Sequence, residues 1–151
     1  MNTSPQLAHP QLETLPEWPT RTIAVLVTVD PAPHAIPVSA PVRADDRRIL
    51  LSLQRSRGSL ARLRTRPAVA LLILTADNIA FTARGTAHIV EEPMDEAPDY
   101  AAIAIDVEEI DDHRQAAFVV ELGVDRRWID THEQHALGGR VETLRALADR
   151  R

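Results

Sequence analysis

The sequence predicts a mainly β fold with some helix (α+β), an antiparallel barrel of six or seven strands, closed or half-open, with short helices. Short runs of β-branched and apolar residues, bounded by Pro, Asp and Asn, follow one another along residues 22–122. The connections between these runs are too short for the crossover helices that parallel strands need. Helical spacing is confined to one short segment and to the C-terminus, which favours hairpins closing into a barrel.

Length and composition fit one domain over residues 1–151. Hydrophobic residues make up 44% of the chain and charged residues 26%, enough apolar content to form a core. The chain has no cysteine, which excludes disulfides, thiolate metal sites and a cysteine nucleophile. A net charge of −5 argues against nucleic acid as a partner. With no signal peptide and no apolar run of about 20 residues, we expect no membrane insertion and a cytoplasmic location.

The N-terminal part predicts a packed leader followed by a buried strand. Residues 1–20 contain four prolines, which permit at most one helical turn, around residues 11–15. Residues 22–29 (TIAVLVTV) are β-branched or small and apolar and end at Asp30-Pro31, the composition of a strand buried on at least one face.

The next two strands are expected at residues 35–42 and 48–53. Pro37 and Pro41 remove two backbone donors from the earlier one, so it should be an edge or bulged strand. An Asp-Asp turn leads into the later one. We expect these two strands and the preceding one to form a meander.

The rest of the chain predicts three or four strands and a final helix. Gly85 indicates a bulge or a close approach of two backbones. In residues 103–110, Ile and Val alternate with acids, which indicates one buried and one solvated face. Gly138-Gly139 weakens the final helix in its middle. The predicted elements are strands at 68–75, 78–92, 103–110 and, as the seventh, 117–122, and a helix at 130–150.

The segment 55–67 (RSRGSLARLRTRP) combines arginines with the start of a helix. We expect this helix to run from Ser59 to about Arg64 and to end at Pro67, because the residue before a proline avoids helical angles. Seven of the 17 arginines lie between residues 47 and 66, and the chain contains no lysine. Such a cluster is either a solvated basic face or an anion site.

The chemistry of this turn suits a phosphate, which is held best by N–H groups at a helix N-terminus together with guanidinium groups. Ser56 and Ser59 supply hydroxyls, and Gly58 lets the backbone approach closely. Arg57 and Arg62 can reach the same oxygens from the first helical turn. We therefore interpret the turn as an anion cradle, in which Arg57, Ser59 and Arg62 bind a cofactor phosphate.

Three runs in this order resemble the pyridoxamine 5′-phosphate oxidase-like, FMN-binding split-barrel family, over about residues 20 to 92. The runs are PHAIPVSAPV, RRILLSLQRSRGSLARLRTRPAVALLIL and AFTARGTAHIVEEP. The family order is a strand with Pro-Val, a strand ending in small hydroxyl residues, an Arg-rich helix ended by Pro, an apolar strand and a strand with Gly-x-Ala. The resemblance implies an antiparallel split β-barrel that binds FMN and is usually a homodimer.

The resemblance also implies which strand residues lie along the flavin. Val38, Ser39 and Ala40 of one strand, and Ser52 and Leu53 of the next, would contact the isoalloxazine ring and the ribityl chain. Backbone groups would do most of the binding, which an edge strand with unpaired donors and acceptors allows.

Three functions stay open at this stage. The first is an FMN-dependent oxidoreductase acting on an unidentified small molecule, and the second is an F420 (deazaflavin)-dependent reductase. The third is a cofactor-binding or regulatory barrel without catalytic activity, which is favoured by Gly58-Ser59 standing where many relatives have lysine. We assign no catalytic residue, and we expect no metal site, because His132 and His135 lack an evident third ligand.

Two charged segments have alternative interpretations. The acidic run 106–112 is interpreted as a solvated strand face, or as a contact for the arginine cluster of a second copy. Arg126-Arg127-Trp128 is similar to the substrate-binding end of true pyridoxamine phosphate oxidases. We interpret it instead as a tryptophan that fills the barrel and two solvated arginines.

Overall fold

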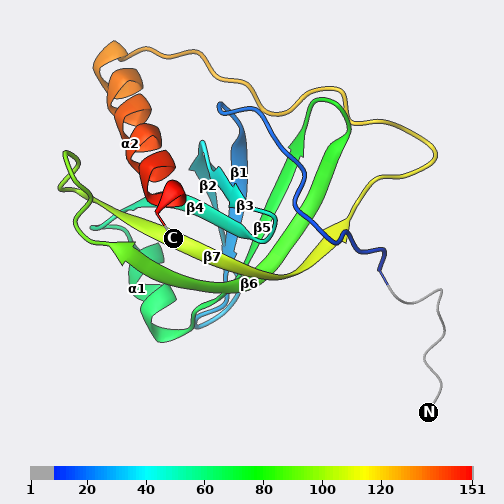
Figure 1. Ribbon diagram of the computed structural model, residues 1–151, viewed down its shortest axis with the longest axis horizontal. Coiled ribbons are helices and arrows are strands. Elements are labelled where there is room, and N and C mark those ends of the chain that lie inside the picture. The colour runs from blue at the N-terminus through cyan, green and yellow to red at the C-terminus, as the bar shows by residue number, and fades with distance from the viewer. Residues whose placement is uncertain (1–8, 151) are drawn as a thin grey trace.

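The computed structural model describes residues 9–150, so residues 1–8 of the predicted leader, and Arg151, lie outside the described residues. One antiparallel sheet of seven strands curls into a half-barrel, with two helices packed against it (Figure 1). The predicted fold class is therefore confirmed. In chain order the elements are β1 (Ile23–Thr28), β2 (His34–Ser39), β3 (Val42–Asp45), β4 (Arg48–Gln54), α1 (Gly58–Thr65), β5 (Ala68–Thr75), β6 (Ile79–Glu91), β7 (Tyr100–Asp112) and α2 (Thr131–Asp149).

The strands lie in the order β2-β1-β5-β6-β7-β4-β3, so the predicted meander is wrong. β1 pairs with β2 and β3 pairs with β4, but within residues 9–150 no pairing joins β2 to β3. The chain passes from one edge of the sheet to the other at Ala40-Pro41, where Ala40 has a φ of 53° and Pro41 has no N–H to donate. The single strand predicted at 35–42 is therefore two edge strands.

The predicted strand at 117–122 is wrong. In residues 113–130 the structure has only an isolated bridge between Gln115 and Phe118. This connection is held against the β5–β6 hairpin, where the backbone N–H of Asn78 donates to the Val120 carbonyl at 3.0 Å. The end of the β5–β6 hairpin extends beyond β1 and β7, but the connection bonds to Asn78 at the turn and forms no ladder with either strand.

β4 and the first half of β7 are buried on both faces, so their side chains alternate between two cores. The inner core, inside the barrel, takes Ile49, Leu51, Leu53, Ile103 and Ile105. The outer core takes Leu50, Ala102 and Ala104, together with Val141, Leu144 and Leu147 of α2. The predicted alternation of one buried and one solvated face in β7 holds only from Asp106 onward.

α2 packs against the outer core beside β3 and β4 (Figure 1). Its N-cap residue is Asp130, whose carboxylate accepts the backbone N–H of His132 at 2.9 Å. The helix is continuous through Gly138-Gly139, because its apolar face is fixed by the outer core rather than by helix propensity. In residues 9–150, no helix combines the length and the apolar character needed to cross a membrane.

Trp18, not Trp128, fills space in the barrel. The Trp18 ring packs against the inner core with its centroid 5.7 Å from that of Phe81, and its Nε1 donates to the Pro41 carbonyl at 2.8 Å. Trp128 lies half-buried beside α2, with the Arg126 guanidinium 4.9 Å from its ring centroid. The interpretation of Trp128 as a barrel-filling residue is wrong, because the connection that carries it stays outside the sheet.

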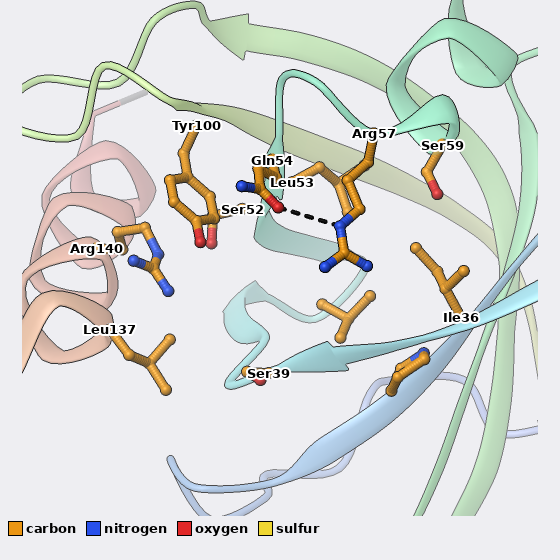
Figure 2. A pocket seen from close by; sticks show the side chains of 12 residues that line it. Ile36, Ser39, Ser52, Leu53, Gln54, Arg57, Ser59, Tyr100, Leu137 and Arg140 are labelled. Carbon is orange, nitrogen blue, oxygen red and sulfur yellow. Dashed lines mark hydrogen bonds between the residues drawn. The ribbon is translucent and has the colours of Figure 1, made fainter. Parts of the chain in front are cut away.

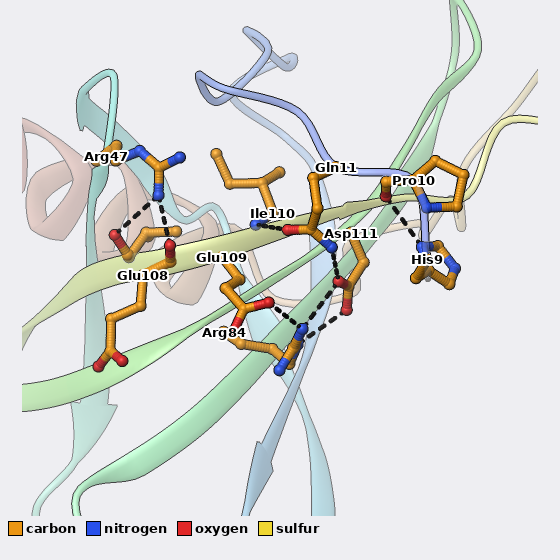
Figure 3. Close-up of polar contacts among 10 residues, drawn as sticks. His9, Pro10, Gln11, Arg47, Arg84, Glu108, Glu109, Ile110 and Asp111 are labelled. Carbon is orange, nitrogen blue, oxygen red and sulfur yellow. Dashed lines mark hydrogen bonds and ion pairs between the residues drawn. The ribbon is translucent and has the colours of Figure 1, made fainter. Parts of the chain in front are cut away.

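The described part of the N-terminal leader is hydrogen-bonded to β7 through Gln11 (Figure 3). The Gln11 side-chain amide donates to the Asp111 carboxylate, and its oxygen accepts the backbone N–H of Ile110 at 3.1 Å. Residues 11–15 contain no helical turn: Gln11 forms an isolated bridge with Asp111, and the chain then bends at Glu13 and Thr14.

Arginines of the same chain compensate the acidic run of β7 (Figure 3). Arg84 Nε donates to Asp111 at 2.9 Å, and Arg84 Nη2 donates to Glu109 at 2.8 Å. Arg48 Nε lies 3.8 Å from Asp106. The acidic run therefore does not need the arginine cluster of a second copy for its charge.

Gly85 marks a bulge, as predicted. The register of β6 against β7 shifts between Arg84 and Gly85. A Cβ built on Gly85 would lie 2.0 Å from the backbone oxygen of Asp106, closer than a non-bonded carbon can approach an oxygen. The two strands can meet at this point only through a residue without a side chain.

We expect Gly85→Ala to lower the free energy of unfolding by about 1–3 kcal/mol, because the added methyl group forces β6 and β7 apart. Gly138→Ala is the matched control, since its Cβ would meet nothing within 4 Å. It should raise the free energy of unfolding by about 0.5–1 kcal/mol through lower backbone entropy. Urea denaturation at neutral pH measures both variants. Equal effects of the two would refute the close approach.

The hydrogen bond from Arg84 holds the pKa of Asp111 below its ordinary value. Asp111 therefore stabilises the fold above its unfolded pKa of about 3.9, and this contribution is lost as the pH falls through the lower folded pKa. We expect Asp111→Asn to lower the free energy of unfolding at pH 7 by about 1 kcal/mol. The difference from the unsubstituted protein should shrink at acid pH. Denaturation between pH 7 and pH 3 checks this, and a difference that stays constant over this range would contradict it.

Candidate functional site

The sheet stays open between β2 and the second half of β4. β2 pairs only with β1, and β4 pairs with β3 no further than Leu50, so Leu51–Gln54 pair with β7 alone. β2 lies beside β4 across this gap. Within the described chain, the facing edges of these two strands carry backbone donors and acceptors without a strand partner, which a ligand can use.

A cavity of about 300 Å³ lies at this gap (Figure 2). This volume is at the lower end of the range for small-molecule sites, roughly 300–1,000 Å³. β2, β4, the start of α1, the start of β7 and the middle of α2 all contribute to its wall. Six residues predicted to bind the cofactor line it, namely Val38, Ser39, Ser52, Leu53, Arg57 and Ser59.

Two of the predicted residues lie outside this lining. Ala40 is buried at the break between β2 and β3 and lines an adjoining hollow beside Trp128. Arg62 lies one turn into α1, where a Cβ on Gly58 would come within 3.0 Å of its Nη1. The Arg62 guanidinium therefore lies over the Gly58 backbone, next to the cavity rather than in its wall.

The start of α1 presents unused donors to the cavity. Arg57 is the N-cap residue, and its Nε donates to Gln54 Oε1 at 3.1 Å, which leaves its terminal nitrogens directed into the cavity (Figure 2). Ser59 is 3% exposed, and its hydroxyl has no hydrogen-bond partner in residues 9–150. The first backbone N–H groups of a helix have no intrahelical acceptor, and Arg57 offers no side-chain cap. This combination suits an anion.

Neighbouring arginines are neutralised by an acid and so are not available to a ligand. Arg55 Nε donates to Glu92 at 3.2 Å, and Arg64 bonds the other oxygen of the same carboxylate. The hydrogen bond from Arg55, with a second from Arg64, holds the pKa of Glu92 below its ordinary value. In the described part of the chain no carboxylate pairs with Arg57 or Arg62. On the α1 side of the cavity, the uncompensated charge therefore belongs to these two residues.

The rim of the cavity also touches the connection before α2. Arg126 Nη1 donates to Ser39 Oγ at 3.0 Å. Arg126 was expected to be solvated, and it is exposed, but this bond brings the Arg126-Arg127-Trp128 segment to the edge of β2. The Ser39 hydroxyl is thus already in use, whereas the Ser59 hydroxyl is not.

Sequence reasoning missed half of the lining. Arg140 could have been found, because it stands three residues after Leu137 and four before Leu144, on the apolar face of the helix. Tyr100 is the single tyrosine of the chain, but nothing in its surroundings marks it. The lining residues that were not predicted are Ile36, Pro37, Gln54, Tyr100, Leu137 and Arg140.

The described histidines do not form a metal-binding group with acids. His132 and His135 are exposed on α2, and no group of three His, Asp or Glu among residues 9–150 is placed to hold a metal ion. The cavity therefore offers guanidinium, hydroxyl and backbone groups around an apolar wall. Such a set binds and orients an anionic organic molecule.

Comparison with known sequences identifies one family. The family model for pyridoxamine 5′-phosphate oxidase matches residues 10–122, which include β1 to β7 and α1 but not α2. None of the curated proteins matches the chain.

Solved structures share the fold at low sequence identity. A putative pyridoxamine 5′-phosphate oxidase from Listeria innocua is 18% identical with a TM-score of 0.50, over 59% of this chain and 86% of the other. An F420 reductase is 17% identical with a TM-score of 0.52, over 62% and 91%. A conserved hypothetical protein from Mycobacterium tuberculosis is 21% identical with a TM-score of 0.50, over 70% and 85%. At these identities the likeness shows a shared fold.

Proposed function

This chain belongs to the pyridoxamine 5′-phosphate oxidase family, and from that premise we propose that it is an FMN-dependent oxidoreductase acting on a small molecule. One observation carries the proposal. The edges of β2 and β4 that have no strand partner within residues 9–150 lie at the same cavity as the start of α1, whose positive charge has no carboxylate partner there. Arg57 and Ser59 are in the wall of this cavity. A phosphate and a planar ring system linked together need this pair of environments side by side.

The residues at the start of α1 fit a phosphate. Arg57 supplies terminal guanidinium nitrogens, Ser59 supplies a hydroxyl, and the first turn of α1 supplies backbone N–H groups. The Arg62 guanidinium lies over the Gly58 backbone, next to the cavity, and adds a second positive charge there. A Cβ at position 58 would lie 3.0 Å from Arg62 Nη1, so the guanidinium would have to shift by a few tenths of an ångström, and glycine leaves it in place beside the proposed phosphate.

The facing strands fit the rest of the cofactor. We propose that Val38, Ser39, Ser52 and Leu53 lie along the isoalloxazine ring and the ribityl chain, with Ala40 at the strand break beyond them. The buried Val38 and Leu53 would keep water from one side of the ring, while the unpaired backbone groups would orient its polar edge. When bound, FMN supplies hydride transfer, and these residues supply its position and its electrostatic surroundings.

We expect the purified protein to bind FMN, and we expect Arg57→Ala and Arg62→Ala each to weaken binding by about 1.5–3 kcal/mol, the contribution of a charge-assisted hydrogen bond. Flavin fluorescence titration measures the affinity. Arg66→Ala is the matched control, because Arg66 is an exposed arginine at the other end of the same helix. Equal affinity in all three variants would contradict the assignment of the phosphate to the start of α1.

An F420-dependent reductase is the second candidate, supported by the TM-score of 0.52 with a protein named F420 reductase. Parallel titration with F420 and FMN decides between the two cofactors. The third candidate is a barrel that binds cofactor without catalysis. It is favoured if NADH and NADPH do not reduce the bound FMN, or if FMN that has been reduced is not reoxidised in air. The cytoplasmic location stays a prediction.

We further propose that the protein forms a homodimer. The connection between β7 and α2 exposes a group of apolar side chains, with Leu122 81% exposed and Val124 71% exposed. Burial of this group between copies would remove it from water. We expect sedimentation equilibrium to give a dimer, and Leu122→Asp to shift it toward monomer. A monomeric wild-type protein at all concentrations would contradict this.

A further inference from the structure

We propose that Arg140 and Tyr100 form a second anion subsite on the α2 side of the cavity, which binds the carboxylate or phosphate of an organic molecule. Figure 2 shows these two residues on one side of the cavity and Ser59 on the other. That an anion binds there follows from the residues themselves. That this anion is the substrate rests on the proposed flavin function.

Arg140 carries a buried charge without a counter-charge. Its side chain belongs to a residue only 9% exposed, and its Nε is buried without a hydrogen-bond partner. Among residues 9–150 no carboxylate pairs with it. A buried cation of this kind is costly unless an anion compensates it, and the side of Arg140 that is not packed in the outer core faces the cavity. A ligand entering the cavity can supply the missing negative group.

Tyr100 orients the Arg140 guanidinium toward the cavity. The guanidinium carbon lies 3.8 Å from the centroid of the Tyr100 ring, a cation–π stack. Stacking occupies the flat face of the guanidinium, whereas its N–H donors all lie in its plane. The donors therefore remain available at the edge, in the geometry that binds two oxygens of a carboxylate or phosphate at once.

The surroundings favour an organic anion over an inorganic one. Leu137 stands one turn before Arg140 on the same side of α2, and Ile36 and Leu53 complete an apolar part of the wall. An apolar body can pack there while its charged group reaches Arg140. Arg57 and Ser59 on the α1 side stay available for a second anionic group, the cofactor phosphate.

The test uses the wild-type protein and the NMR signals of the arginine Nε–Hε groups. The probes are benzoate and phenyl phosphate, with benzamide as the neutral analogue of benzoate. We expect at least one of the two anions to shift the Arg140 signal in a saturable manner, and benzamide to leave it unchanged. The anion that binds with the higher affinity identifies the preferred charged group, carboxylate or phosphate. No shift with either anion, or an equal shift with benzamide, would overturn the proposal.

Substitutions give an independent readout. Arg140→Gln should weaken binding of the preferred anion by about tenfold or more, the equivalent of one charge-assisted hydrogen bond. Arg145→Gln is the matched control, because Arg145 is exposed on the same helix and donates to Thr20. It should leave the affinity unchanged. Thermal melting confirms that both variants fold, and Arg140→Lys, which retains the charge, should bind more tightly than Arg140→Gln. Equal affinities in the wild type and Arg140→Gln would refute the subsite.

The same measurements separate this proposal from the proposed flavin site. Arg57→Ala should weaken FMN binding and leave binding of the anion at Arg140 unchanged. The anion should still bind in the presence of saturating FMN. Displacement of the anion by FMN would overturn its assignment as substrate. Anion binding at Arg140 in a protein that binds no FMN would support the subsite and reject the proposed function.

Discussion

One gap in an otherwise continuous sheet determines where this protein can bind a ligand. The chain leaves β2 at Ala40-Pro41 and continues as β3 at the opposite edge, so β2 never pairs with β4, although the two lie side by side. Backbone groups that would have bonded each other in a closed barrel are left for a ligand. The cavity, both of its strand walls and the approach of α1 and α2 follow from this break.

The charges around the gap are distributed by the rest of the fold. Glu92 neutralises two arginines of the cluster, Arg55 and Arg64, and leaves Arg57 beside the cavity. On the other side, α2 brings a buried arginine to the wall because its apolar face is held by the outer core. The result is an apolar hollow with a positive group on each of two sides, which suits a ligand or a pair of ligands with two separated negative charges.

Local sequence signals predicted most elements, and long-range pairing explains the errors. The runs that form β1 and β5 could be predicted as strands without knowing their neighbours, since their composition suits a buried sheet. The order of the strands depends on the pairing of β4 with the distant β7, which no local pattern shows. Residues 117–122 have the composition of a strand but form no ladder with the sheet. At the site, the α1 start was visible as a phosphate-like motif, whereas Arg140 lies near it only because α2 folds back across β4.

A crystal structure of the protein with FMN would show directly whether the gap between β2 and β4 is the cofactor site. We expect the flavin ring to lie in the gap between β2 and the second half of β4, with the FMN phosphate within hydrogen-bond distance of the Arg57 guanidinium and the Ser59 hydroxyl. FMN bound on another face, or with its phosphate directed away from the start of α1, would contradict it.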